Sequence, residues 1–459
     1  MKFSKSDIRQ KFKKIPHLQF ESEGPMTAFG GLVLFQKLFG VLDLKARLCR
    51  CFSHLDRDAI FRHGTSMLLL IVQILLGQRR LRGRDLLAGD PLVKRVLGVT
   101  ALPDVATMSR MLSSADARSV EAVRMLSREV VLDRVASEEL RVATLDFDGS
   151  VQSTKGHAEG TAVGFNKVRK GARSYYLLFC TLAQTGQVLD RHHRSGNVHD
   201  SNGAVAFMKQ CRDAVRDRLP GARIETRFDS AFFEEGLLAS LDEDGVEFTG
   251  SVPFERFPPL KQKLEAVRDW HRINDTWSYA TCDWRPKSWT TRNRILLMRK
   301  KCEVQRKGPL QLDLFEPRDY SYDYKVIVTN KLDHPRTVLH FHNGRGSQEK
   351  IFGECKQYAA LDVIPTRTLH GNQLFTLASL LVHNLSRELQ MRAAPATRGT
   401  DPKRPARWAF LSLGTLRQRL VCRVGRLLRP QGRLTLRMSA DDSVAAEINQ
   451  YMAGLRRAA

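Results

Sequence analysis

The spacing of apolar residues changes near Glu139, and this change restricts the possible folds more than any other feature of the sequence. From about Gly30 to Val135, apolar side chains recur at intervals of three and four, which predicts amphipathic helices. The segment LRVATLDFDGSVQ then predicts a buried strand that ends in a turn at Gly149 and Ser150. We therefore expect a helical region, followed by a region in which strands and helices alternate.

The strand pattern continues after this first strand. Residues 174–183 and 188–192 predict a hairpin joined by a Gly-containing turn. Residues 202–219 have helical periodicity, and residues 223–228 predict a short strand that ends at Asp229. The order strand, hairpin, helix, strand predicts a mixed α/β fold.

A different pattern follows between about residues 251 and 330. This segment is strand-rich and aromatic, and it contains Trp270, Trp277, Trp284 and Trp289. It predicts an antiparallel β insertion. Helical periodicity returns over residues 345–360 and 372–391, and the Pro-containing segment AAPATRGTDPKRP then predicts a linker.

The charge of the chain indicates the class of its partner. Its 459 residues include 74 Lys or Arg and 49 Asp or Glu, which gives a net charge of +25. Between Arg387 and Arg437 there are 13 basic residues and two acidic ones. Such an excess is typical of proteins that bind a polyanion, so we expect a nucleic acid as partner.

Several other classes of protein are disfavoured. The longest apolar run, Met67–Leu76, has about half the length that a membrane-spanning helix needs. The eight cysteines are scattered without zinc-finger spacing, which predicts free thiols in a reducing compartment. The sequence contains no phosphate-binding loop and no serine-hydrolase elbow. We expect a cytoplasmic protein with no membrane partner.

Three acidic residues are candidates for chemistry. Asp148 and Asp229 each follow an apolar strand, and Asp146 points to the same side as Asp148 because side chains alternate along a strand. Glu349 lies in GRGSQEKIFGECK, where Arg345, Glu349 and Lys356 fall along one stripe of a helix. Carboxylates from separate elements repel one another, and holding them together usually requires a divalent cation. Oxygen-only ligands favour Mg²⁺ or Mn²⁺ over Zn²⁺.

Each of these residues also has a purely structural interpretation. A carboxylate at the end of a strand is often only a helix cap or a turn former. Arg345 and Glu349 can form an ordinary ion pair across one helical turn.

At these residues the sequence resembles the bacterial insertion-sequence transposases of the D-D-E class, which have a ribonuclease-H-like core. The resemblance runs from about Asp146 to Lys356. It is strongest to the subgroup with a Tyr-x2-Arg-x3-Glu-x6-Lys signature, in which the last three positions match Arg345, Glu349 and Lys356. His342 stands where that subgroup has Tyr. The family's aspartates match Asp148-Gly149-Ser150 and Asp229-Ser230.

The resemblance implies a catalytic mechanism. Asp148, Asp229 and Glu349 would be catalytic and would ligate Mg²⁺, for which Mn²⁺ usually substitutes. The metal would promote cleavage at the terminal inverted repeats of an insertion sequence and strand transfer into target DNA.

The resemblance also implies DNA contacts. Arg345 and Lys356 would hold phosphates, and His342 occupies the position of a third contact. Trp289 or Trp284 would receive a flipped base, although tryptophans in a β region are more often core residues. Strand transfer needs two transposon ends, so we expect at least a dimer on double-stranded DNA. In a bacterial cytoplasm, the DNA-bound protein would lie at the nucleoid.

Combining pattern and resemblance, we expect an α/β fold with five regions. These are a helical N-terminal DNA-binding region (1–138), the first part of the ribonuclease-H-like core (139–250), a β-rich insertion (251–335), the last part of the core (336–392) and a basic C-terminal tail (393–459). Two alternatives to a transposase stay open. One is a non-catalytic DNA-binding repressor derived from a transposase. The other is a metal-dependent glycosyltransferase, whose D-x-D motif Asp146 and Asp148 would satisfy.

Overall fold

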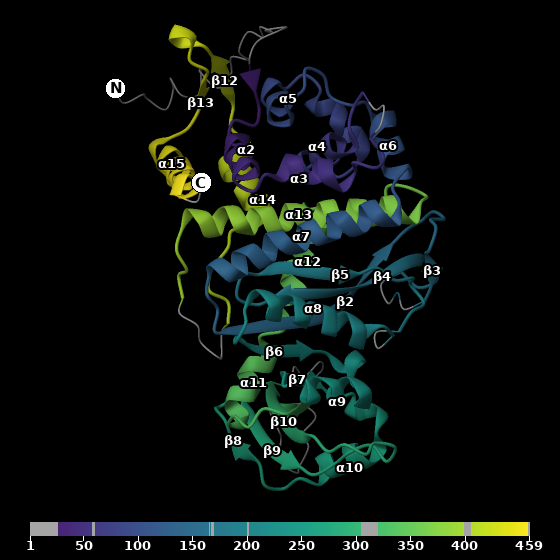
Figure 1. The fold of residues 1–459 in the computed structure, drawn as a ribbon. Helices are drawn as coiled ribbons and strands as arrows, with labels where there is room; N and C mark the ends of the chain where they lie inside the picture. Colours follow the sequence, from purple (N-terminus) through teal and green to yellow (C-terminus); the bar gives the residue numbers. More distant parts are fainter. Residues whose placement is uncertain are drawn as a thin grey trace, which may run out of the picture.

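A mixed sheet forms the centre of the molecule (Figure 1). The computed structural model describes residues 26–457 except 57–59, 165, 167–168, 200–201, 304–319 and 399–404. Strands β5 (Gln187–His192), β4 (Arg173–Leu182) and β2 (Val142–Ser153) pair antiparallel. Strands β6 (Arg223–Phe228) and β7 (Glu247–Ser251) continue the sheet parallel to β2. The predicted mixed α/β core is confirmed.

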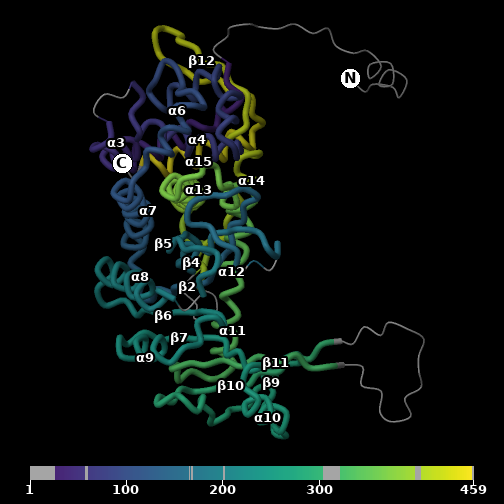
Figure 2. The backbone as a smooth tube through the Cα atoms, turned by 90° about the vertical axis from the view of Figure 1, so that its right-hand side faces the viewer, coloured from purple at the N-terminus to yellow at the C-terminus, as the bar shows by residue number. Residues whose placement is uncertain are grey.

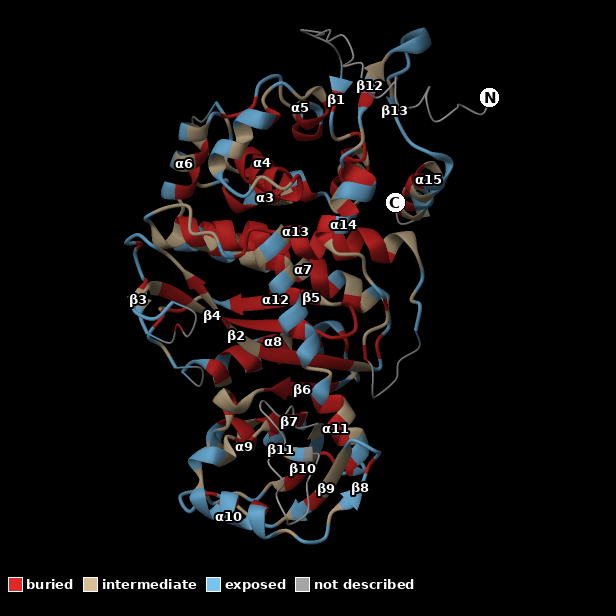
Figure 3. Ribbon diagram, turned by 180° about the vertical axis from the view of Figure 1, so that it is seen from behind, coloured by how far each residue is buried: buried red, intermediate tan, exposed pale blue. Residues whose placement is uncertain are grey.

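Helices cover both faces of this sheet, as side-chain alternation along β4 shows. Leu178 and Cys180 pack with α7 (Ala117–Ser137), α8 (Ala204–Arg218) and α9 (Glu235–Glu243). The alternate residues Leu177 and Phe179 lie on the opposite face, where they pack with α12 (Gly346–Tyr358) and α13 (Leu369–Ala393). Figure 3 shows the resulting buried layer at the centre of the molecule.

The predicted β insertion extends the same sheet. Strand β11 (Tyr320–Thr329) pairs antiparallel with β7, and β10 (Arg294–Glu303), β9 (Trp277–Cys282) and β8 (His271–Arg272) follow in order. Helix α10 (Pro258–Ala266) precedes these strands. Helix α11 (Pro335–Asn343) covers one face through Val338 and Leu339. Figure 2 shows β10 and β11 projecting from the body of the molecule.

The segment before the sheet is helical. It comprises α2 (Leu32–Val41), α3 (Leu44–Cys51), α4 (His63–Leu75), α5 (Pro91–Leu97) and α6 (Val105–Ser113), followed by α7. The apolar run around Met67 lies in α4, which is buried along almost its whole length and packs on α13. Among the helices that the structure describes, none is long and apolar enough to cross a membrane.

The C-terminal segment does not form the expected tail. Strand β12 (Gly425–Leu428) pairs with β1 (Met26–Thr27) and β13 (Thr435–Met438), and α14 (Leu413–Leu416) packs on α12. Helix α15 (Asp442–Arg457) packs on α13 and α2. Helix α15 packs there because it carries an apolar stripe at intervals of four, three and four, which the high local charge obscures in the sequence. The stripe consists of Val444, Ile448, Tyr451 and Leu455.

A buried ion pair joins the two central strands. Arg227 on β6 and Asp146 on β2 are register partners, and each is about 1% exposed. The guanidinium donates to both carboxylate oxygens, at 2.5 and 2.7 Å. Its remaining Nη1 donates to the carbonyl of Phe341 in α11 at 2.8 Å. The pair therefore fixes β2, β6 and the end of α11 relative to one another.

Replacing one member of this pair should destabilise the fold strongly. Arg227→Met leaves the Asp146 carboxylate buried without its partner, so we expect the free energy of unfolding to fall by about 3–5 kcal/mol. The double variant Asp146→Leu, Arg227→Met should recover much of that loss, because no buried charge is left unpaired. Denaturant unfolding followed by circular dichroism measures both changes.

An exposed ion pair provides the control. Arg292 pairs with Asp283 at 3.0 Å, with side chains that are 68% and 82% exposed. Arg292→Met should cost less than about 1 kcal/mol. Equal losses for Arg227→Met and Arg292→Met would contradict the role assigned to the buried pair.

Candidate active site

Asp148 and Asp229 lie side by side at neighbouring strands. Phe147 of β2 is the register partner of Phe228 of β6, so the next residues, Asp148 and Asp229, occupy corresponding positions. Both follow Asp146 and Arg227 by two residues and therefore face the same side of the sheet as that ion pair. The sequence prediction that these two carboxylates come together agrees with this register.

The predicted end of the first strand was wrong. Strand β2 continues through Gly149 and Ser150 to Ser153, because these residues keep pairing with Leu178 and Leu177 of β4. Asp148 is thus held within a paired strand, and its Oδ1 accepts a hydrogen bond from the amide of Gly149 at 2.8 Å. Asp229 does end its strand, where its Oδ1 accepts from the amide of Ala231 at 2.9 Å.

Helix α12 brings Glu349 to the same face of the sheet. Phe352 of α12 packs on Phe179, the register partner of Asp148, with ring centroids 4.9 Å apart. The side-chain amide of Gln348 donates to the carbonyl of Asp146 at 2.9 Å. These contacts fix the first turn of α12 beside β2. Glu349 lies in this turn with a side chain that is 68% exposed.

Arg345 lies between two of the three predicted carboxylates. Its Nη1 is 3.0 Å from Oδ2 of Asp148, and its Nη2 is 3.8 Å from Oε1 of Glu349. The guanidinium compensates part of the negative charge at this edge of the sheet. Its position depends on Gly344, where an added Cβ would lie 2.2 Å from Nη1 of Arg227.

Lys356 belongs to the last turn of the same helix. Burial lowers the pKa of its ammonium, while the carboxylates of Asp362 and Asp148 act in the opposite direction. The charge of Lys356 is therefore felt at Asp148. The structure places Lys356 and Arg345, at opposite ends of α12, within electrostatic reach of one carboxylate.

The chemistry of these ligands suits a divalent cation. Asp148 and Asp229 offer carboxylate oxygens from adjacent strands, which is the ligand type that Mg²⁺ and Mn²⁺ prefer. Within the part of the chain that the structure describes, no three His, Cys, Asp or Glu side chains are close enough together to hold a metal ion. Asp148 and Asp229 therefore offer the ligand type that such an ion prefers, and Glu349 does not complete a group of three ligands with them in this conformation.

His342 is packed against β7 and has little access to solvent. Its side chain is buried, with Nδ1 3.1 Å from Oγ1 of Thr249 and Nε2 3.0 Å from Oγ of Ser251. Burial, together with the charges of Lys325 and Arg345, holds the pKa of His342 well below its usual value. The expected DNA contact of His342 is not available here, because both ring nitrogens bond to β7. The only sequence signal for the burial of His342 was its position in an amphipathic helix.

The two candidate tryptophans pack inside the insertion. Trp289 stacks on Phe233, with ring centroids 4.5 Å apart at 28°, and Trp284 meets Phe257 edge-on at 5.1 Å. Both border the apolar cluster that β6, β7, α8 and α9 share, and both are half-buried. These contacts are those of core residues, which is the alternative that the sequence left open.

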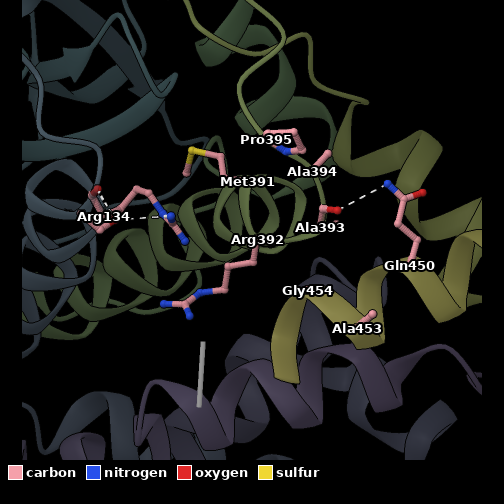
Figure 4. Close-up of a pocket in the computed structure, with 10 residues that line it drawn as sticks. Arg134, Met391, Arg392, Ala393, Ala394, Pro395, Gln450, Ala453 and Gly454 are labelled. Carbon is pink, nitrogen blue, oxygen red and sulfur yellow. Dashed lines mark hydrogen bonds between the residues drawn. The ribbon is translucent and has the colours of Figure 1, made fainter. Parts of the chain in front are cut away.

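A cavity of about 750 Å³ lies elsewhere, at the ends of α7, α13 and α15 (Figure 4). Its walls include Arg134, Arg392 and Gln450, whose Nε2 donates to the carbonyl of Ala393. None of the three predicted carboxylates lines it.

Sequence reasoning missed two residues that support the candidate site, Arg227 and Gln348. Arg227 sits two residues before Asp229 in RIETRF, so alternation alone puts the two side chains on one face. Gln348 precedes Glu349 and carries no charge that would single it out. The signal for Arg227 was present, whereas none existed for Gln348.

Comparison with known proteins places the chain in a family. Residues 11–459 match the family model described as transposase DDE domain group 1. None of the curated proteins matches. Among solved structures, the chain is similar to the piggyBac transposase synaptic complex with hairpin DNA, at 12% identity and a TM-score of 0.45, over 85% of this chain and 80% of that one.

A second similarity is to the Mos1 transposase paired-end complex with the left transposon end. It has 13% identity and a TM-score of 0.18, and it covers 36% of this chain and 56% of that one. The family match, in contrast, extends over nearly the whole sequence. The chain therefore belongs to the family of transposases with a DDE domain.

Proposed function

We propose that this transposase cleaves and rejoins DNA at the terminal inverted repeats of its element, with Asp148, Asp229 and Glu349 as ligands of Mg²⁺. The observation that carries the proposal is the register of β2 and β6, which sets two carboxylates side by side under the helix that bears the third. The alternative of a glycosyltransferase would leave this helix and the charge of +25 unexplained.

Each residue has a separate task in this scheme. Asp148 and Asp229 hold the metal from rigid strands, and the exposed side chain of Glu349 turns inward to complete the set. The divalent ion supplies activation of the attacking oxygen and stabilisation of the leaving oxygen in phosphodiester displacement. With a divalent ion held by the carboxylates, Asp148 would no longer need Arg345 for charge compensation, and Arg345 would be available to hold a DNA phosphate. Lys356 holds a second phosphate.

Two copies of the chain act together in the proposed reaction. Joining both ends of an element to one target requires that both ends are held at once, so the active form is at least a dimer on DNA. The net charge of +25 supports extensive contact with phosphates. Mn²⁺ should replace Mg²⁺ because it accepts the same oxygen ligands.

Neutral replacements of the carboxylates should separate cleavage from binding. In Asp148→Asn, Asp229→Asn and Glu349→Gln, the metal loses a charged ligand. We expect end cleavage to fall by more than about 10²-fold, because even outer partners of metal sites are worth about 10–100-fold. Binding of a duplex with the repeats that flank the gene should persist. Nicking assays with Mg²⁺ and anisotropy titrations measure the two properties.

Glu265→Gln makes the same chemical change on the exposed surface of α10 and serves as a matched control. This variant should cleave like the wild type. If the wild type binds the repeats tightly and never cuts them, the protein is a DNA-binding repressor. Undiminished cleavage by Asp229→Asn would remove that residue from the metal site.

A sulfur ligand should change the metal preference. Asp148→Cys places a thiol where a metal oxygen ligand is proposed, and Mn²⁺ accepts sulfur better than Mg²⁺ does. We expect this variant to be inactive with Mg²⁺ and to regain part of its cleavage with Mn²⁺. The wild type should cleave with either ion. Equal activity of Asp148→Cys with both ions would argue against direct contact between residue 148 and the metal.

A further inference from the structure

The insertion hairpin brings a lysine to the edge of the sheet that carries the catalytic carboxylates. Gly250 of β7 is the register partner of Phe228 on one side and of Val328 on the other. The next row across the sheet therefore consists of Asp148, Asp229, Ser251 and Ile327. Residues in one row point to the same face.

Lys325 lies two residues beyond Ile327 toward that same edge. Because alternation repeats every two residues, its side chain shares the face of Asp148 and Asp229. Its Nζ donates to Oδ1 of Asn343, the last residue of α11, at 2.9 Å. Asn343 is only two residues from Arg345, so the ammonium lies at the junction of α11 and α12.

Two other cations, Arg345 and Lys300, act on Lys325. Its side chain is half-buried, and burial is the main cause of its lowered pKa, followed by the charges of Arg345 and Lys300. In the described parts of the chain, no carboxylate forms an ion pair with Lys325. A cation that is partly removed from water beside two further cations costs free energy unless an anion compensates it.

We propose that Lys325 binds a DNA phosphate next to the scissile bond and so positions the strand that reaches Asp148 and Asp229. The inference rests on the proposed function and adds a residue from the insertion to the phosphate-binding set. A lysine suits this task because its ammonium acts as a point charge with three rotatable donors. Lys300 lies on the same face of the hairpin, diagonally opposite Lys325, and adds to the local potential.

A structural role is the competing explanation, since Lys325 also tethers the end of α11 through Asn343. The two roles differ in their response to salt. A phosphate contact contributes about one unit to the slope of log K against log salt, and a tether contributes nothing. The conservative variant Lys325→Arg keeps the charge, whereas Lys325→Met keeps only the apolar stem.

The experiment uses the full-length protein and a duplex with the inverted repeats that flank its gene. For Lys325→Met we expect the salt slope of binding to fall by about one unit, with a lower kcat/KM for cleavage and an unchanged melting temperature. Lys325→Arg should restore the slope. Lys301→Met removes the same charge from the opposite face of the same hairpin and serves as control, so it should leave cleavage unchanged.

A neutral phosphate provides a second readout. Methylphosphonates are placed one at a time around the cleavage position. At one position, the methylphosphonate should slow cleavage by the wild type and have no further effect on Lys325→Met, because the methylphosphonate and the substitution remove the same contact. Additive losses at every position would overturn the proposal.

The outcomes separate this inference from the proposed function. If the wild type fails to cut the ends, the proposed function fails, and this inference fails with it. If the wild type cuts and Lys325→Met shows an unchanged salt slope and an unchanged kcat/KM, only the role of Lys325 is overturned. A lower melting temperature with an unchanged slope would show a tether and would also overturn it.

Discussion

The buried pair of Asp146 and Arg227 determines how the active-site edge is built. A guanidinium that is 1% exposed and bonded to both oxygens of one carboxylate fixes the register and spacing of β2 and β6. Its third bond, to the carbonyl of Phe341, attaches α11 to the same strands. Two residues further along each strand stand Asp148 and Asp229. The geometry of the proposed catalytic pair thus depends on a neighbouring ion pair that is buried within the fold.

Charge compensation is the second principle of this edge. Carboxylates that are held close together need positive charge, and Arg345 supplies it by contacting Asp148 and approaching Glu349. A metal ion and a DNA phosphate together replace this arrangement in our scheme, because the metal takes over the carboxylates and the phosphate takes over the arginine. Arg345 would therefore compensate the carboxylates before DNA binds and contact a DNA phosphate afterwards. In our scheme, the exposed side chain of Glu349 turns inward to complete the metal site.

Much of the core could be predicted from hydrophobic spacing. The strand at residues 223–228 has the predicted bounds, and the hairpin and the helix that bears Glu349 were also expected. The end of β2 was wrong because Gly149 and Ser150 are weak strand formers that pairing with β4 overrides. The C-terminal segment folds back because its apolar stripe outweighs its charge.

For the candidate site, residue type and spacing selected the side chains, and the structure shows where each of them lies. Asp148 and Asp229 occupy corresponding positions because their strands are parallel neighbours. Alternation along one strand predicts the face of a side chain and not the neighbouring strand. The burial of His342 depends on hydrogen bonds to Thr249 and Ser251, more than 90 positions away, which local pattern does not reveal. The position of Lys325 could not be predicted from local pattern either, since only the pairing of β7 with β11 places it at this edge.

The most direct test of the account is a structure of the protein bound to transposon-end DNA in Ca²⁺, which occupies oxygen sites without supporting rapid cleavage. We expect an ion held by both Asp148 and Asp229, with Glu349 turned inward and Arg345 on a phosphate. An ion bound away from these carboxylates, with Arg345 still paired to Asp148 in the DNA complex, would contradict it.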